Sequence, residues 1–184
     1  GARPFARVWV HNALLRMGED KMSKSLGNVV SIREALERFS PDALRLFFLS
    51  SHYRSPLSYT DEAISAQDRA LERLRNAVET PPAPSASGRL DPDDYREKFI
   101  AGMDDDLNTP RALAALFDLA RDINRGRDSG QDVTEAQEIL RTLAGTLGLA
   151  LTAPASGSSD VGPLVELLIE TRATLREAKQ FDAA

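Results

Sequence analysis

Apolar residues recur with a helical period along most of this 184-residue chain. Leu44, Phe47 and Phe48 give a short example, because positions i, i+3 and i+4 share one face of a helix. Stripes of the same kind run through residues 60–78, 91–103, 109–123, 133–147 and 161–175. The pattern predicts a mostly α-helical fold whose helices pack mainly through Leu and Ala side chains.

Local capping chemistry predicts where the first helices begin. Ser31 and Glu34 have the Ser-x-x-Glu spacing of a capping box, so a helix should start there and run to about Phe39. Ser40 then serves as the N-cap of the next helix, with Pro41 at its first position. We therefore expect two short helices in succession from residue 31 onward.

Further helix starts follow the same logic. Thr60 is the expected N-cap of a third helix, and the two acidic residues after it suit the positive end of that helix. Asp91-Pro92 and Thr109-Pro110 mark the next two starts, since proline is tolerated in the first turn. Another helix is expected over residues 133–147, and a last one from about Val161.

Other stretches lack the helical period. Residues 8–16 hold several large apolar side chains, and we expect one short strand there, or two around the loop that follows. Residues 80–88 and 153–162 are rich in Pro, Ser and Gly without an apolar pattern, so they are predicted linkers.

The amino-acid composition excludes several classes of site and of protein. The absence of cysteine excludes a disulfide framework and a thiol nucleophile in these residues, and two distant histidines make a zinc site a poor prediction. No apolar run suits a membrane span and no signal peptide is visible, so we expect a cytoplasmic protein with no membrane partner.

The net charge of −5 is unevenly distributed. Residues 1–78 carry 12 basic and 9 acidic side chains, whereas residues 79–184 carry 11 basic and 19 acidic ones. Any RNA should therefore meet the first half or specific basic spots. The plainer interpretation of the acidic half is a solvated helical domain.

The segment Lys21-Met22-Ser23-Lys24-Ser25 is the strongest indication of chemistry. Two lysines among small polar residues, bounded by glycines, suit a mobile loop that binds phosphate. A lysine that reaches phosphate oxygens mainly in the transition state lowers the barrier instead of only tightening ATP binding. The plainer alternative is a solvated turn that happens to hold two lysines.

This segment resembles the ATP-handling KMSKS loop of class I aminoacyl-tRNA synthetases. The wider chain resembles the cysteinyl-tRNA synthetase family, most clearly in residues 9–12, 21–28, 42–45, 51–59 and 103–110. These segments are WVHN, KMSKSLGN, DALR, SHYRSPLSY and MDDDLNTP.

The resemblance implies roles for individual residues. Lys24 would contact ATP with help from Lys21, and the rest of the KMSKS loop would complete the ATP-binding segment. His11 would lie near the catalytic pocket. The implied partners are tRNA-Cys, cysteine and ATP, the last as its magnesium complex.

The resemblance also implies a division of the chain. Residues 1–30 would end the catalytic domain, 31–79 would form a helical stem-contact region, and 80–89 a linker. Residues 90–184 would form an antiparallel, DALR-like tRNA-binding bundle that is incomplete at its C-terminal end.

Two parts of the family's machinery are missing from this sequence. These are a His-Ile-Gly-His motif for ATP and the ligands of a zinc ion that binds the cysteine thiolate. We therefore expect a fragment that lacks the N-terminal catalytic domain, with zinc ligands outside the chain and no metal site within it. Alone, it should not form cysteinyl adenylate.

Several charged residues have two interpretations. Arg54, Arg121 and Arg125 are candidate tRNA contacts, but a surface or ion-paired role is equally plausible for Arg54. The other two arginines, at i and i+4, would also suit a helix C-terminus. Residues 104–106 are three consecutive aspartates, which seldom converge on one metal ion and better explain a helix boundary.

Two alternatives to a cysteine–tRNA ligase fragment remain. One is the paralogous ligase that joins cysteine to an amino sugar in mycothiol synthesis, which has a similar loop and would bind no tRNA. The other is a non-catalytic helical interaction module that keeps the loop as a relic.

Overall fold

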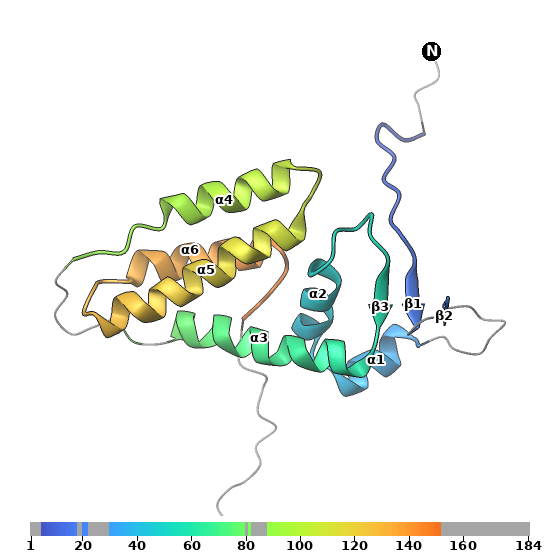
Figure 1. Ribbon diagram of the computed structural model, residues 1–184, viewed down its shortest axis with the longest axis horizontal. Coiled ribbons are helices and arrows are strands. Elements are labelled where there is room, and N and C mark those ends of the chain that lie inside the picture. Colours follow the sequence, from blue (N-terminus) through green and yellow to red (C-terminus); the bar gives the residue numbers. More distant parts are fainter. Residues whose placement is uncertain (1–4, 18–19, 22–29, 80, 82–87, 152–184) are drawn as a thin grey trace, which may run out of the picture. The chain divides into compact units, whose positions relative to one another are not determined.

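The computed structural model describes residues 5–17, 20–21, 30–79, 81 and 88–151 (Figure 1). The chain divides into two compact units, residues 1–152 and 153–184, and every described residue belongs to the first. The linker and helix predicted beyond residue 153 lie outside the described residues, as does most of the linker predicted over 80–88.

The described part is mostly helical, as the apolar periodicity predicts. Its helices are α1 (Ile32–Arg38), α2 (Pro41–Leu49), α3 (Asp61–Glu79), α4 (Asp93–Asp104), α5 (Thr109–Asp128) and α6 (Thr134–Thr146). α5 contacts α3, α4 and α6, and the chain reverses direction from α4 to α5 and again from α5 to α6 (Figure 1). The predicted antiparallel arrangement is therefore confirmed for these helices.

The predicted caps of the first three helices are confirmed. The Ser31 hydroxyl accepts the N–H of Glu34 at 3.2 Å, and the Glu34 carboxylate accepts the N–H of Ser31 at 2.7 Å. Ser40 and Thr60 cap α2 and α3 in a similar way, each hydroxyl accepting a backbone N–H at 3.1 Å. Each cap satisfies a donor that the helix itself leaves free.

A small sheet forms around the segment that precedes α1. β1 (Leu15–Met17) lies between β2 (Asp20–Lys21), which is antiparallel to it, and β3 (Leu57–Tyr59), which is parallel to it. Parallel strands need a crossover connection, and the chain segment that contains α1 and α2 supplies it.

The short strand expected within residues 8–16 is present only at the end of that stretch, because β1 begins at Leu15. Pairing occurs only where β2 and β3 lie beside the chain, and β3 is too short to show an alternating pattern in the sequence. Val8, Trp9 and Val10 lie before the strand and are 77%, 69% and 60% exposed.

Four helices share one hydrophobic core. Leu46, Leu71, Leu116 and Leu140, one from each of α2, α3, α5 and α6, are fully buried. Burial of a leucine side chain stabilises a fold by about 1.5–3 kcal/mol. None of the described helices combines the length and apolar character that a membrane crossing requires.

A buried carboxylate joins the two ends of this core. Asp42, in the first turn of α2, accepts the backbone N–H groups of Ala150 and Leu151, both at 3.2 Å. Two guanidinium groups supply compensating charge: that of Arg45 lies 3.4 Å from the carboxylate, and that of Arg75 on α3 lies 4.0 Å from it. Leu151 has a φ of 51°, a conformation that non-glycine residues seldom adopt, and the hydrogen bond to Asp42 helps to hold it.

The C-terminal end of α3 is completed by side chains from α6. The Gln137 amide donates to the carbonyl of Ala77 at 2.7 Å, and the Arg141 guanidinium donates to the carbonyl of Val78. The last carbonyls of a helix have no partner within the helix, so these contacts satisfy acceptors that would otherwise need water.

Replacing Asp42 by Ala should lower the free energy of unfolding by about 2–4 kcal/mol, because two N–H groups lose their acceptor and Arg75 loses its counter-charge. Asp93→Ala, which removes an exposed ion pair with Arg96, should cost less than about 1 kcal/mol. Urea denaturation of both variants measures the difference. Equal stability of the two would contradict the role of Asp42.

The space around two helical glycines predicts opposite effects of an added methyl group on stability. A Cβ added at Gly102 would lie 2.9 Å from the backbone nitrogen of Ala112, so Gly102→Ala should cost about 1–3 kcal/mol of stability. A Cβ added at Gly145 of α6 meets nothing within 4 Å, so Gly145→Ala should stabilise by up to about 1 kcal/mol. Thermal denaturation tests both, and a shift in the same direction would refute the packing argument.

Candidate functional site

The KMSKS loop, residues 21–25, begins at the edge of the small sheet. Lys21 is the last residue of β2, and its backbone pairs with Arg16 of β1. β2 is an outer strand of the described sheet, so the first loop residue is held at that edge. Residues 22–25, Lys24 among them, lie outside the described residues, and their ATP-binding roles stay predictions.

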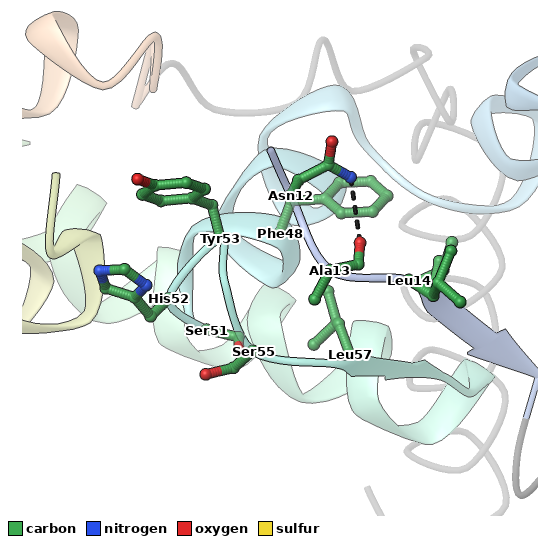
Figure 2. Close-up of a pocket in the computed structure, with 10 residues that line it drawn as sticks. Asn12, Ala13, Leu14, Phe48, Ser51, His52, Tyr53, Ser55 and Leu57 are labelled. Carbon is green, nitrogen blue, oxygen red and sulfur yellow. Dashed lines mark hydrogen bonds between the residues drawn. The ribbon is translucent and has the colours of Figure 1, made fainter. Parts of the chain in front are cut away.

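A pocket of about 210 Å³ opens beside the chain that leads to this loop (Figure 2). It is lined by residues 12–15, Phe48, residues 51–53, Ser55 and Leu57. The side-chain amide of Asn12 donates to the carbonyl of Ala13 at 3.0 Å and steadies one wall. His11 is exposed and is not among the lining residues, so its place in an ATP site stays a prediction.

A cluster of polar side chains lies at one end of the pocket. The rings of His52 and Tyr53 stack with their centroids 4.8 Å apart (Figure 2). The Tyr53 hydroxyl donates to Asp106 Oδ1 at 2.7 Å, and Arg54 donates to the same carboxylate from Nε at 2.7 Å and from Nη2 at 3.2 Å. His52 Nε2 lies 3.9 Å from Asp106 Oδ2. These four residues are called the Asp106 cluster.

The charges in the Asp106 cluster reinforce one another. Hydrogen bonds from Arg54 and Tyr53 lower the pKa of Asp106 to about 2. The hydrogen bond to Asp106 in turn raises the pKa of Tyr53 and the pKa of Arg54. The cluster therefore holds an anionic carboxylate, a cationic guanidinium and a neutral phenol at neutral pH.

The arginines predicted as tRNA contacts all have acidic partners. Arg54 is held by Asp106, and Arg121 and Arg125 each pair with the aspartate three positions before, at 2.8 Å and 2.9 Å. Arg121 lies twelve residues along α5 from Thr109, which is about 18 Å at the helical rise. The structure thus does not bring it together with Arg54. An RNA phosphate would compete with a carboxylate at each arginine, and their contact with tRNA stays a prediction.

The run of three aspartates marks a helix boundary, as predicted. α4 ends at Asp104, and α5 follows Asn108, whose side chain accepts the N–H of Arg111 at 3.3 Å. The Asp105 carboxylate pairs with Arg111 at 3.4 Å, whereas Asp106 faces the loop at residues 51–56. Neighbouring carboxylates in this turn therefore serve different partners.

A larger groove of about 510 Å³ has a different character. Its walls come from α1, α2 and Tyr59, and they include Ile32 and Phe48, which are 78% and 50% exposed. The Tyr59 hydroxyl is buried, and no hydrogen bond to it is found in the described part of the chain. The groove brings few polar groups together and so resembles a packing surface more than a catalytic pocket.

Sequence reasoning does not find the Asp106 cluster. Tyr53 and Asp106 are 53 positions apart, and no local pattern links them. The one available signal is that residues 52–54 are three consecutive side chains able to donate hydrogen bonds. Such a run predicts a polar partner somewhere in the fold without indicating which one.

The lowered pKa of Asp106 predicts how the cluster responds to acid. The folded pKa of about 2 lies below the ordinary value of 3.8, so the contribution to stability is complete above about pH 5 and is lost as pH falls through 4 towards 2. The stability difference between the wild type and Asp106→Asn should be constant from about pH 7 to 5 and shrink below. Urea denaturation across this range tests it, and a difference independent of pH would contradict it.

Two protein families match the chain. Residues 1–69 match the family described as tRNA synthetases class I (C) catalytic domain, and residues 98–152 match the DALR domain. The first match includes the KMSKS loop and residues 52–54, and the second includes Asp106. The Asp106 cluster thus joins the two matched segments.

Curated relatives are similar along the whole chain. The cysteine–tRNA ligase of Dehalococcoides mccartyi is 48% identical over 186 residues, which cover 100% of this chain and 41% of that protein. The cysteine–tRNA ligases of Thioalkalivibrio sulfidiphilus and Thermosipho africanus are 43% and 37% identical, over 98% and 99% of this chain and 40% and 41% of those proteins. The chain spans about two fifths of the length of these relatives.

Among solved structures, the ternary complex of Agrobacterium radiobacter K84 agnB2 LeuRS with tRNA and LeuAMS contains a similar chain. The TM-score is 0.56 at 17% identity, over 78% of this chain and 22% of that chain. At this identity the likeness concerns the fold alone.

Proposed function

We propose that this chain, which belongs to the cysteine–tRNA ligase family, supplies the KMSKS loop and the tRNA-binding helices of an enzyme that activates cysteine and joins it to tRNA-Cys. The observation that carries the proposal is similarity along the whole chain, at 48% identity to a cysteine–tRNA ligase. The presence of both family segments within one compact unit supports it.

In the proposed reaction, an oxygen of the cysteine carboxylate attacks the α-phosphorus of ATP. The bond from that phosphorus to the bridging oxygen breaks, pyrophosphate leaves, and cysteinyl adenylate remains. A ribose hydroxyl at the 3′ end of the tRNA then attacks the carbonyl carbon and displaces AMP. Negative charge accumulates on phosphate oxygens in the first step, and Lys24, assisted by Lys21, is proposed to stabilise it.

The position of Lys21 supports this role. A mobile loop that closes over phosphates needs one fixed end. Lys21 ends an edge strand whose partner, β1, is paired on its other side with β3. The sheet therefore gives the proposed ATP-binding loop a fixed starting point.

The substrates and partners belong to the same proposal. The enzyme would act in the cytoplasm on Mg-ATP, cysteine and tRNA-Cys, together with catalytic-domain residues outside this chain. The described residues do not fit a resident zinc ion, because no group of three or more His, Asp or Glu side chains among them is placed to hold one. Zinc ligands would have to come from elsewhere in the protein.

The helical bundle is the proposed tRNA-binding part. Arg121 and Arg125 remain candidate contacts because their side chains are 63% and 71% exposed and lie on one helix face. Exposed ion pairs are weak, so a phosphate can compete with the aspartates that hold these arginines.

In the full-length protein that carries this chain, Lys24→Ala should raise the barrier to cysteine activation by roughly 2–4 kcal/mol, as expected for a lost charge-stabilising contact. Cysteine binding should barely change. Lys98→Ala, which removes the same charge from the exposed part of α4, is the control. Cysteine-dependent ATP–pyrophosphate exchange measures the rates, and an unaltered rate in Lys24→Ala would remove Lys24 from the mechanism.

Charging of a tRNA-Cys transcript tests the second half of the reaction. Exchange followed by charging is the expected result. Exchange without charging, with cysteine joined to an amino sugar instead, would favour the mycothiol-pathway ligase.

A further inference from the structure

One carboxylate holds together parts of the chain that belong to different family segments. Asp106 lies in the turn between α4 and α5, and its two oxygens accept three hydrogen bonds from Tyr53 and Arg54. The backbone N–H of Arg54 also donates to His52 Nδ1 at 3.2 Å. The loop at residues 51–56 is therefore bound to the turn between α4 and α5 by three hydrogen bonds, all accepted by Asp106.

The backbone of the turn presents Asp106 in an unusual conformation. Asp106 and Leu107 have φ values of 53° and 54°, in the left-handed region that non-glycine residues seldom occupy. The N–H of Leu107 donates to the carbonyl of Met103 at 3.1 Å, and the N–H of Asn108 donates to that of Gly102 at 3.0 Å. A conformation of this kind persists where surrounding contacts fix it, and such positions tend to serve function.

The other side of the loop is attached to the chain that leads into the KMSKS loop. The N–H of Ala13 donates to the carbonyl of Tyr53 at 2.8 Å, and the N–H of Leu57 donates to that of Leu14 at 3.4 Å. β3 then continues in parallel register along β1, which pairs with the strand that ends at Lys21. The loop at residues 51–56 is therefore attached to the turn that carries Asp106 on one side and to the small sheet on the other.

We propose that Asp106 is a positioning residue that fixes the helical bundle against the loop at residues 51–56, and so against the small sheet, through Tyr53 and Arg54. The inference rests on the proposed function, because it assigns the bundle to tRNA. When tRNA engages the bundle, this contact sets the direction from which the tRNA reaches the catalytic part of the enzyme. Activation of cysteine without tRNA does not need this contact.

The strength of the cluster agrees with a positioning role. All four of its side chains are at least partly exposed, and exposed ion pairs contribute little to global stability. A two-pronged arginine–carboxylate contact nevertheless fixes direction as well as distance. A small misplacement of catalytic groups, caused far from the chemistry, is enough to slow a reaction strongly.

The test uses the full-length protein that carries this chain and measures two reactions on the same sample. Asp106→Asn should keep cysteine-dependent ATP–pyrophosphate exchange within about twofold of wild type, while kcat/KM for charging tRNA-Cys falls about tenfold, a typical size for coupling between sites. Asparagine tolerates the left-handed conformation, so the turn should be retained. Tyr53→Phe keeps the stacked ring, removes one hydrogen bond and should cause a smaller loss in the same direction.

Asp105→Asn is the matched control, because Asp105 lies in the same turn but contacts Arg111 and not the loop. It should preserve both reactions. Equal losses of exchange and charging in Asp106→Asn would show a merely structural role and overturn the inference. Unchanged or faster charging would indicate that Arg54, once released, serves as an RNA contact, and would overturn it as well. A wild-type protein without cysteine-dependent exchange would overturn the proposed function, and the inference with it.

Discussion

The fold depends on one buried carboxylate at the start of a helix. Asp42 sits in the first turn of α2 and accepts a hydrogen bond from Arg45 of the same helix, yet it also accepts hydrogen bonds from backbone N–H groups 108 and 109 positions further along the chain. A charge is tolerated in this interior because backbone donors and the guanidinium groups of Arg45 and Arg75 surround it. The hydrogen bonds to Ala150 and Leu151 hold the end of the segment that matches the DALR domain, residues 98–152, against the helices that follow the KMSKS loop. The helices of both matched segments therefore share one hydrophobic core.

Much of the helical fold could be predicted because helix starts are written in neighbouring residues. Ser31, Ser40 and Thr60 act within three positions of the groups they cap, and the apolar stripes show which faces become buried. The sheet could not be predicted in this way. β1 forms where the chain can pair with β3, and the residues of β3 lie about forty positions further along the sequence.

In the candidate site, too, features that depend on neighbouring residues can be predicted and features that depend on distant residues cannot. The two lysines of the KMSKS loop stand out because their chemistry is local to five residues. The sequence of Arg54 and its neighbours is compatible with either an RNA contact or an ion pair. The structure pairs Arg54 with Asp106, whose position depends on how α4 and α5 meet. A charged side chain identifies its chemistry in the sequence, but its partner is chosen by the fold. That is why the Asp106 cluster required the structure.

The completion of α3 by α6 has a consequence for how this protein can change over evolutionary time. Gln137 and Arg141 donate hydrogen bonds to the terminal carbonyls of α3. Helix α3 precedes the proline-rich stretch at residues 80–88 in the sequence, whereas both of these residues follow it. A recombination event that replaced only the later segment would leave α3 with unsatisfied acceptors and an open core. The two segments are therefore expected to be inherited together, even where the sequence between them looks like a natural place to divide the gene.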